Sequence, residues 1–377
     1  MKKTLIISIL LLFVVFISCS GKDEEEKSGN RVIIAYVGGY KGLVDINKIS
    51  PDKITHINYA FVDVKDGKAF LTNEATDTVN FRKLNELKQQ NPDLKILISI
   101  GGWSWSKNFS DAVLTGDGQK IFAKSAVDIM GKYNLDGVDI DWEYPAIPGD
   151  KDNVYRPEDK RNYTLMFAAI RAELDALSKT TDKKYLLTTA VGGFQKFIDN
   201  TEMGKAQEYL DYVNIMSYDN QSNEIAIHHT NLYPSDNYEI KSSAATAIDG
   251  FIKAGVPAEK LVMGIAFYGR IFQLKKGASK GLGEEIDKQI QGKGYTYIKD
   301  SLVNKDEYYR YWDNPAQAPY LYNFYKGIFV TYDDEESVKA KCEYVKENNM
   351  AGVMFWEYSS DPKEYLLDEI NKVFSGQ

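Results

Sequence analysis

The chain alternates short apolar segments with amphipathic ones, and this alternation limits the possible fold more than any other sequence feature. From residue 31 onward, eight apolar segments have the length of β-strands. Near-continuous apolar strands are typical of a parallel sheet that is covered by helices. We expect the strands at residues 32–37, 54–61, 95–100, 137–141, 185–190, 212–216, 261–267 and 352–356.

Helical periodicity fills most of the intervals between these strands. Apolar residues recur three or four positions apart, as Val127, Met130 and Tyr133 do. Eight such units predict a (β/α)8 TIM barrel of the α/β class. The alternative is a doubly wound open sheet, but the first strand is not followed by the Gly-rich phosphate loop usual in that fold. We expect helices at residues 77–90, 119–133, 157–178, 240–254 and 335–348.

The interval between the seventh and eighth strands is longer than one helix and two loops require. It is rich in Tyr, Gly and Lys, and residues 295–298 and 308–312 have strand-like composition. We therefore predict a small α+β insertion at residues 271–326, with the barrel formed by residues 31–270 and 327–377. The insertion would lie on the C-terminal face, where barrel enzymes carry their active sites.

The N-terminal residues are predicted to lie outside the barrel. Two lysines precede an apolar run at residues 5–17, which is short for a transmembrane helix and typical of a signal peptide. The serine and Cys19 that follow resemble a bacterial lipobox. We expect a signal peptide at 1–18, lipidation of Cys19 and a disordered acidic tether at 19–30. An ordinary secretory signal containing a chance cysteine is the alternative.

The expected location follows from this anchor. A lipidated Cys19 would attach an exported protein to the bacterial outer membrane, and its acidic tether resembles the surface-export signals of some Gram-negative lipoproteins. Lipidation would leave Cys342 as a single thiol, so no disulfide framework is expected. The net charge is −8 without a basic stripe, which argues against nucleic-acid binding. We expect a monomer that contacts the membrane only through its lipid.

Three acids dominate the fourth predicted strand. Asp139, Asp141 and Glu143 alternate with apolar residues, so they share one face of the strand at a spacing of roughly 7 Å. Burying an unpaired ionised carboxyl costs several kcal/mol, and neighbouring negative charges add to that cost. We expect some of these acids to be protonated and to share protons. Folding gives no reason for such a row, whereas acid catalysis does.

Two other interpretations of the acidic strand fit the sequence less well. A solvated acidic loop would not alternate with apolar residues. A Mg²⁺ or Ca²⁺ site lacks the calcium-loop spacing, and His228 and His229, two of only three histidines, are expected in a polar loop. We expect no metal and no cofactor. A proton shared with Asp141 would hold the apparent pKa of Glu143 near the operating pH, as a general acid requires.

The acidic strand also carries a family resemblance. Residues 136–143 resemble the D-x-x-D-x-D-x-E signature of glycoside hydrolase family 18, the chitinase-like barrels. Residues 99–103, 216–219 and 267–270 are similar to the family motifs that end strands three, six and seven, and Trp356 is similar to its floor tryptophan after strand eight. The insertion resembles that of one chitinase subgroup. The five motifs occur in order, so the resemblance covers the chain from about residue 31.

The resemblance implies a retaining hydrolase that cleaves β-1,4 bonds of N-acetylglucosamine glycans, such as chitin and chitooligosaccharides, with assistance from the substrate. Glu143 would protonate the leaving oxygen while the 2-acetamido group forms an oxazolinium intermediate. Asp141 would hold the acetamido N–H, and Asp139 would be its proton partner, supported by Tyr36 and Ser99. The substrate-binding residues implied are Tyr36, Phe61, Ser99, Trp103, Tyr144, Met216, Tyr218, Asp219, Arg270 and Trp356.

Some alternatives remain within this resemblance. One is an endo-β-N-acetylglucosaminidase that acts on N-glycan cores. Another is a lectin-like binding protein, but such relatives typically lack the last acid of the signature, which is present here as Glu143. Tyr40, Trp105 and Trp312 are weaker candidates for outer sugar platforms. Glu357 departs from the family pattern, in which a small residue more commonly follows the floor tryptophan.

Overall fold

The structure is a computed structural model that describes residues 31–376 of the chain. The predicted signal peptide (1–18), the lipidation site Cys19 and the tether (19–30) lie outside the described residues. Among the described helices, none combines the length and the apolar character needed to cross a bilayer.

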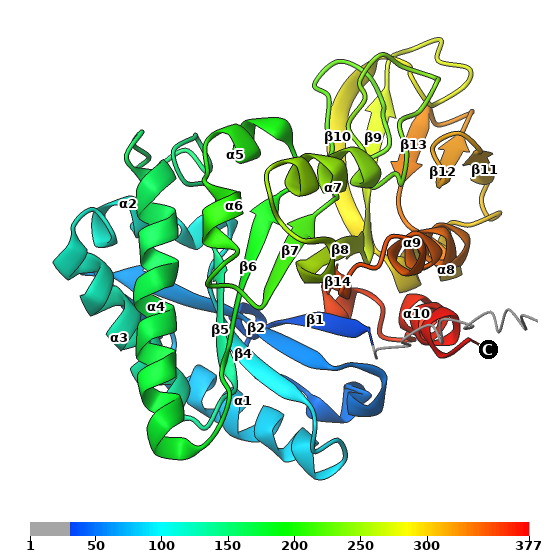
Figure 1. Cartoon of the computed structure of the whole chain (residues 1–377). Helices are drawn as coiled ribbons and strands as arrows, with labels where there is room; N and C mark the ends of the chain where they lie inside the picture. Colours follow the sequence, from blue (N-terminus) through cyan, green and yellow to red (C-terminus); the bar gives the residue numbers. More distant parts are fainter. Residues whose placement is uncertain (1–30, 377) are drawn as a thin grey trace, which may run out of the picture. The chain divides into compact units, whose positions relative to one another are not determined.

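Eight parallel strands close into a barrel (Figure 1). β1 pairs with β14 on one side and with β2 on the other, so the order β1-β14-β8-β7-β6-β5-β4-β2 returns to its start. This confirms the predicted TIM barrel. A short strand, β3 (Lys68–Phe70), pairs antiparallel with the end of β2. The barrel strands are β1 (Val32–Gly38), β2 (His56–Lys65), β4 (Lys95–Gly101), β5 (Gly137–Asp141), β6 (Leu186–Gly192), β7 (Tyr212–Met216), β8 (Leu261–Ala266) and β14 (Gly352–Trp356).

Helices surround the strands (Figure 1), and side-chain caps define where several of them begin. Asn73, Thr115 and Ser243 each accept a hydrogen bond from a first-turn N–H, and Asp334 forms a capping box. The helices are α1 (Glu74–Glu86), α2 (Phe109–Ala112), α3 (Gly116–Lys132), α4 (Asp159–Thr181), α5 (Gln195–Asp199), α6 (Met203–Ala206), α7 (Ala244–Lys253), α8 (Tyr295–Ser301), α9 (Glu335–Glu347) and α10 (Tyr365–Ser375). Short 3₁₀ helices are η1 (Gly39–Lys41), η2 (Ile46–Lys48), η3 (Pro51–Lys53), η4 (Leu87–Gln89), η5 (Trp103–Trp105), η6 (Ala258–Lys260) and η7 (Tyr358–Ser360).

A second, antiparallel sheet lies between β8 and β14 in the sequence, with the strand order β10-β9-β13-β12-β11. It begins at Tyr268 and its last strand ends at Thr331, so it extends on both sides of the predicted insertion at 271–326. Its strands are β9 (Tyr268–Leu274), β10 (Ile286–Gly294), β11 (Tyr309–Asp313), β12 (Ala318–Asn323) and β13 (Ile328–Thr331).

The strand-like interpretation of residues 295–298 was wrong, because this segment forms the first turn of α8. Gly294 ends β10 and takes the position before the helix. Tyr295 and Ile298, three residues apart, are both buried, so helical spacing places the two apolar side chains on the same packed face. Packing therefore outweighs the strand preference of tyrosine and β-branched residues.

A fully buried ion pair ties the second sheet to the barrel. Lys341 on α9 donates to both carboxylate oxygens of Asp333 at 2.8 and 2.7 Å, and to the carbonyl of Thr230 at 2.6 Å. Asp333 follows β13, and it also accepts a hydrogen bond from the N–H of Ala266 at the end of β8. The pair thus fixes the ends of β8 and β13 against α9.

We expect Lys341→Met to lower the free energy of unfolding by about 3–5 kcal/mol, because it leaves the Asp333 carboxylate buried without its charge partner. The matched control is Lys124→Met. Lys124 pairs with Asp128 on the exposed surface of α3, where solvent screens the pair, so its loss should leave the midpoint of urea denaturation almost unchanged. Urea denaturation measures both variants, and equally small shifts in the two midpoints would contradict the prediction.

Candidate active site

A cavity of about 900 Å³ opens where the barrel strands reach their C-terminal ends. It collects side chains from the ends of several strands, as the active sites of TIM barrels do. Eleven of the predicted site residues line it: Tyr36, Phe61, Trp103, Asp141, Glu143, Tyr144, Met216, Tyr218, Asp219, Arg270 and Trp356.

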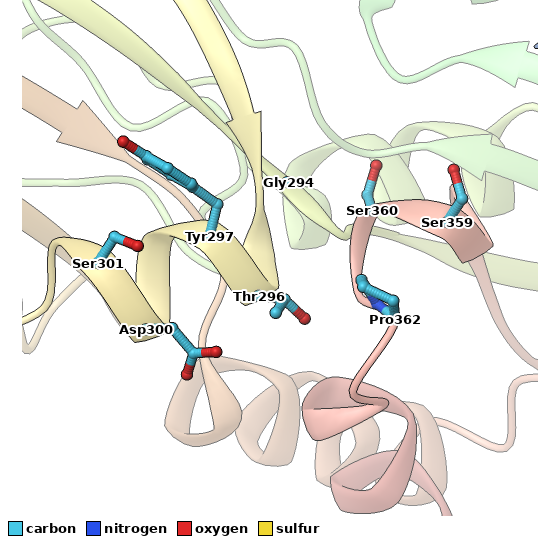
Figure 2. A pocket seen from close by; sticks show the side chains of 8 residues that line it. All are labelled: Gly294, Thr296, Tyr297, Asp300, Ser301, Ser359, Ser360 and Pro362. Atoms are coloured by element: carbon cyan, nitrogen blue, oxygen red, sulfur yellow. The ribbon is translucent and has the colours of Figure 1, made fainter. Parts of the chain in front are cut away.

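A second hollow, of about 480 Å³, lies between α8 and the segment that includes η7 (Figure 2). Four of its polar side chains already bind neighbouring residues: Asp300 accepts from Lys363, Thr296 donates to Asp361, and Ser359 and Ser360 donate to Glu357. The hollow contains none of the predicted site residues. The cavity at the barrel mouth is therefore the candidate active site.

Asp139 is fully buried below the cavity and accepts four side-chain hydrogen bonds. The donors are Tyr36 at 2.9 Å, Ser99 at 2.7 Å, Thr188 at 2.6 Å and Asn214 at 3.2 Å. Burial raises the pKa of Asp139, and the hydrogen bonds to its carboxylate oppose that rise. Asp139 is thus held by the barrel interior and does not line the cavity.

Asp141 follows Asp139 on the same face of β5 and lies closer to the cavity. Its Oδ1 atom is buried and has no hydrogen-bond partner within residues 31–376. Burial, together with the negative charges of Glu143 and Asp139, raises the pKa of Asp141 well above its ordinary value. An unpaired carboxyl oxygen beside a cavity can accept a hydrogen bond from a ligand N–H.

Glu143 lies just beyond the end of β5, on a segment that is held at both sides. Its backbone N–H donates to the hydroxyl of Ser106 at 2.9 Å, and its carbonyl accepts from Asn153 at 2.6 Å. Burial raises the pKa of Glu143 to about 7, with a contribution from the charge of Asp219 and against a hydrogen bond from Tyr144. Glu143 can therefore hold or release a proton near neutral pH.

Asp219 faces the cavity from the loop after β7, with a left-handed backbone (φ 61°). Its Oδ1 accepts from the hydroxyl of Tyr268 and from the Nε of Arg270, each at 2.6 Å. Burial opposes ionisation, but His229 and Arg270, which both face the carboxylate, hold the pKa of Asp219 well below its usual range. Asp219 is therefore a fixed negative charge that acts on Glu143.

Aromatic rings form one wall of the cavity. The rings of Trp356 and Phe61 are nearly parallel with centroids 5.5 Å apart, and Tyr40 lies parallel to Trp356 at 6.3 Å. Trp105 contacts Phe61 edge-on and also lines the cavity. Trp312, in contrast, lies on β11 beneath the guanidinium of Arg310 and does not line it. The four rings that do line the cavity offer flat apolar area to a ligand.

Comparison with known proteins agrees with this geometry. The sequence profile of the glycosyl hydrolases family 18 matches residues 31–361. The chain belongs to this family. It is 36% identical over 432 residues to Chitinase A1 of Niallia circulans, and the match covers 97% of this chain and 61% of that protein. The chain therefore spans less than two thirds of the length of this relative.

Two solved structures are also similar to this family 18 chain. One is a glycoside hydrolase family 18 N-acetylglucosaminidase from Paenibacillus barengoltzii, with a TM-score of 0.85 and 38% identity over 91% of this chain and 100% of that one. The other is chitinase ChiW from Paenibacillus sp. str. FPU-7, with a TM-score of 0.86 and 37% identity over 92% of this chain and 43% of that one.

The two adjacent histidines of this family 18 site differ from the sequence predictions, whereas Ser99 has the expected place beside Asp139. Ser99 donates to Asp139 from below and does not line the cavity. His228 and His229 are not in a solvated polar loop, because each is only 1% exposed. His228 contacts Asp313 at 3.1 Å, and His229 lies 3.6 Å from Asp219. The described residues 31–376 contain no cluster of His, Cys, Asp and Glu arranged to hold a metal ion.

Sequence reasoning did not select several polar residues of the site. Thr188 and Asn214 complete the hydrogen bonds to Asp139, and Tyr268 binds Asp219. The signal for Thr188 and Asn214 was available, since each is a polar residue within an apolar strand segment. Tyr268 lies within the motif at residues 267–270, which the sequence analysis had selected, whereas no local pattern marks His229.

Proposed function

We propose that this chain is a retaining glycoside hydrolase that cleaves the β-1,4 bonds of chitin or chitooligosaccharides by substrate-assisted catalysis. The observation that carries the proposal is the pairing of Asp141 and Glu143 in one cavity. Asp141 has a buried oxygen without a partner within residues 31–376, and Glu143 has a pKa of about 7. An acetamido sugar offers an N–H that can donate to Asp141 and a leaving oxygen that Glu143 can protonate.

In the first step, protonated Glu143 would donate its proton to the glycosidic oxygen as the bond to C1 breaks. The acetamido oxygen of the same sugar would bond to C1 and form an oxazolinium ion, while Asp141 accepts the acetamido N–H. In the second step, ionised Glu143 would take a proton from water, whose oxygen adds to C1 and opens the ring. Two displacements at C1 retain its configuration, and Glu143 ends protonated as it began.

The other side chains of the cavity support the same substrate. Trp356 and its parallel neighbours offer apolar area to sugar rings, while Arg270 and Asp219 offer a donor and an acceptor. The names of Chitinase A1 and of the Paenibacillus N-acetylglucosaminidase support a substrate built from N-acetylglucosamine. We assign the sheet β9 to β13 to the insertion of the chitinase subgroup on its position between β8 and β14.

The experiment that tests the proposal compares products from three substrates: chitooligosaccharides, chitin and a glycoprotein with N-linked glycans. We expect N-acetylglucosamine or its short oligomers from the first two, with the β-anomer formed first. Release of intact N-glycans without action on chitooligosaccharides would instead indicate an endo-β-N-acetylglucosaminidase. Hydrolysis of none of the three would contradict the proposal.

The activity should fall as the pH rises above about 7. The first step needs protonated Glu143, whose pKa burial raises to about 7, so the basic limb of kcat/KM should have its midpoint near that pH. Initial rates on a soluble chromogenic glycoside measure this limb. Full activity retained at pH values well above 7, where Glu143 is ionised, would show that another group supplies the proton.

We also propose that the protein is exported and held at the outer membrane through lipid on Cys19. The sequence around Cys19 and the acidic segment after it support this location, and the similar chitinase ChiW is a cell-surface-expressed enzyme. Labelling with a clickable palmitate should mark the full chain but not Cys19→Ala. Equal labelling of both would contradict the assignment.

A further inference from the structure

His229 occupies a position behind the cavity that the proposed mechanism does not use. It lies in the segment between β7 and α7, with its backbone N–H bound to the hydroxyl of Thr331 at 3.0 Å. Its ring is 1% exposed and lies 5.3 Å from the ring of Tyr268. Its Nδ1 is 3.6 Å from Oδ1 of Asp219. Neither ring nitrogen has a hydrogen-bond partner within residues 31–376.

Asp219 shows why this position matters. Within the described part of the chain, the hydrogen bonds to its carboxylate come from Tyr268 and Arg270, and both end on Oδ1. The side chain is 41% exposed and lines the cavity, so Oδ2 is the oxygen available to a ligand. His229 approaches the carboxylate from the Oδ1 side, where a third donor would fix the orientation of both oxygens.

We propose that His229 is a positioning residue, which donates from Nδ1 to Oδ1 of Asp219 when substrate binds and keeps Oδ2 directed at the aminosugar. The separation of 3.6 Å is too long for a hydrogen bond in the free protein. Catalytic hydrogen bonds are often long without substrate and shorten in the complex. The inference rests on the proposed function, since it assigns Asp219 to the binding of the substrate.

The surroundings of His229 favour a neutral ring that donates one hydrogen bond. The charged and titratable groups that face it are Asp219 from the loop after β7, Tyr268 and Arg270 from β9, and Asp333 after β13. Burial lowers the pKa of His229, and the positive charge of Arg270 acts in the same direction, against the two aspartates. A neutral ring supplies a donor without adding a second positive charge beside Asp219.

The chain provides a matched control in the adjacent residue. His228 is equally buried, but its Nε2 faces Asp313 at 3.1 Å, on the side of the second sheet. Replacing either histidine by leucine removes a buried imidazole of the same size from the same segment. Only the replacement at 229 removes a donor that faces Asp219.

The test compares His229→Leu, His229→Asn and His228→Leu, using the kcat/KM for a nitrophenyl glycoside of an N-acetylglucosamine disaccharide across pH. We expect His229→Leu to lower kcat/KM about tenfold and to move its acid limb to higher pH, because Asp219 loses a donor to its ionised form. His229→Asn, whose amide can donate at the place of Nδ1, should recover most of the loss. His228→Leu should stay within about twofold of the wild type.

A second readout does not depend on turnover. In the free protein the N–H dipole of His229, 3.6 Å from Oδ1, already favours the ionised carboxylate of Asp219. The pKa of Asp219, followed by carbon NMR and assigned with Asp219→Asn, should therefore rise in His229→Leu and stay unchanged in His228→Leu. An unchanged pKa of Asp219, or equal kinetic losses in the two leucine variants, would overturn the role of His229. Wild-type protein that hydrolyses no aminosugar glycoside would remove the proposed function instead, and the NMR comparison would still decide between a donor and a packing residue.

Discussion

Glu143→Gln is expected to lower kcat by about 10³- to 10⁴-fold, which is the largest kinetic effect predicted for a single substitution in this chain. Glutamine keeps the shape of the side chain, but its amide can neither give a proton to the leaving oxygen nor take one from water. The protein should remain folded, because burial already raises the pKa of Glu143 and disfavours its charge. Substrate binding should also persist.

The measurement is kcat on chitooligosaccharides, together with the melting temperature and the dissociation constant for the same oligosaccharide. The control is Glu343→Gln on α9, a half-exposed carboxylate outside the cavity, which should leave kcat within about twofold. A Glu143→Gln variant that turns over at the wild-type rate would remove Glu143 from the role of general acid. A variant that is inactive because it is unfolded would show a lowered melting temperature.

The barrel and its acidic strand could be predicted because their signals are local. Apolar strands and helical periodicity recur along the chain, and the predicted bounds of β5, β7 and β14 agree with the structure. The two-residue alternation placed Asp139, Asp141 and Glu143 on one face, and the structure brings the last two into the cavity. Such patterns need no knowledge of which strands become neighbours.

The rest of the site depends on contacts between distant segments. Asp139 meets Tyr36, which is 103 residues away, and Asn214, which is 75 residues away, only because the strands close into a barrel. His229 approaches Asp219 because its segment is bound to Thr331 of the second sheet, 102 residues later. A polar residue in a loop carries no local sign that packing will bury it, so both histidines were misplaced.

The two buried acids of β5 should respond in opposite ways to removal. Asp139 accepts four hydrogen bonds, so Asp139→Ala leaves four buried donors without their acceptor and should lower the free energy of unfolding by about 2–4 kcal/mol. Asp141 has a buried oxygen with no partner within residues 31–376, and its pKa is raised well above the ordinary value by burial and by Glu143. Asp141→Ala removes that cost.

Asp141→Ala should therefore lower kcat by about 10²-fold or more, because the acetamido group loses its acceptor, and yet stabilise the protein by about 1 kcal/mol at neutral pH. The sign of the pH dependence follows from the raised pKa. Below about pH 4, Asp141 is protonated in both the folded and the unfolded wild type, so the variant has no advantage there. As the pH rises from about 4 toward the folded-state pKa, only the unfolded wild type ionises freely, and the advantage of the variant grows.

Urea denaturation of wild type, Asp139→Ala and Asp141→Ala at several pH values measures these differences in the free energy of unfolding. A loss of stability in Asp141→Ala as large as that in Asp139→Ala would mean that Asp141 is held by the fold, and not kept unpaired for a substrate.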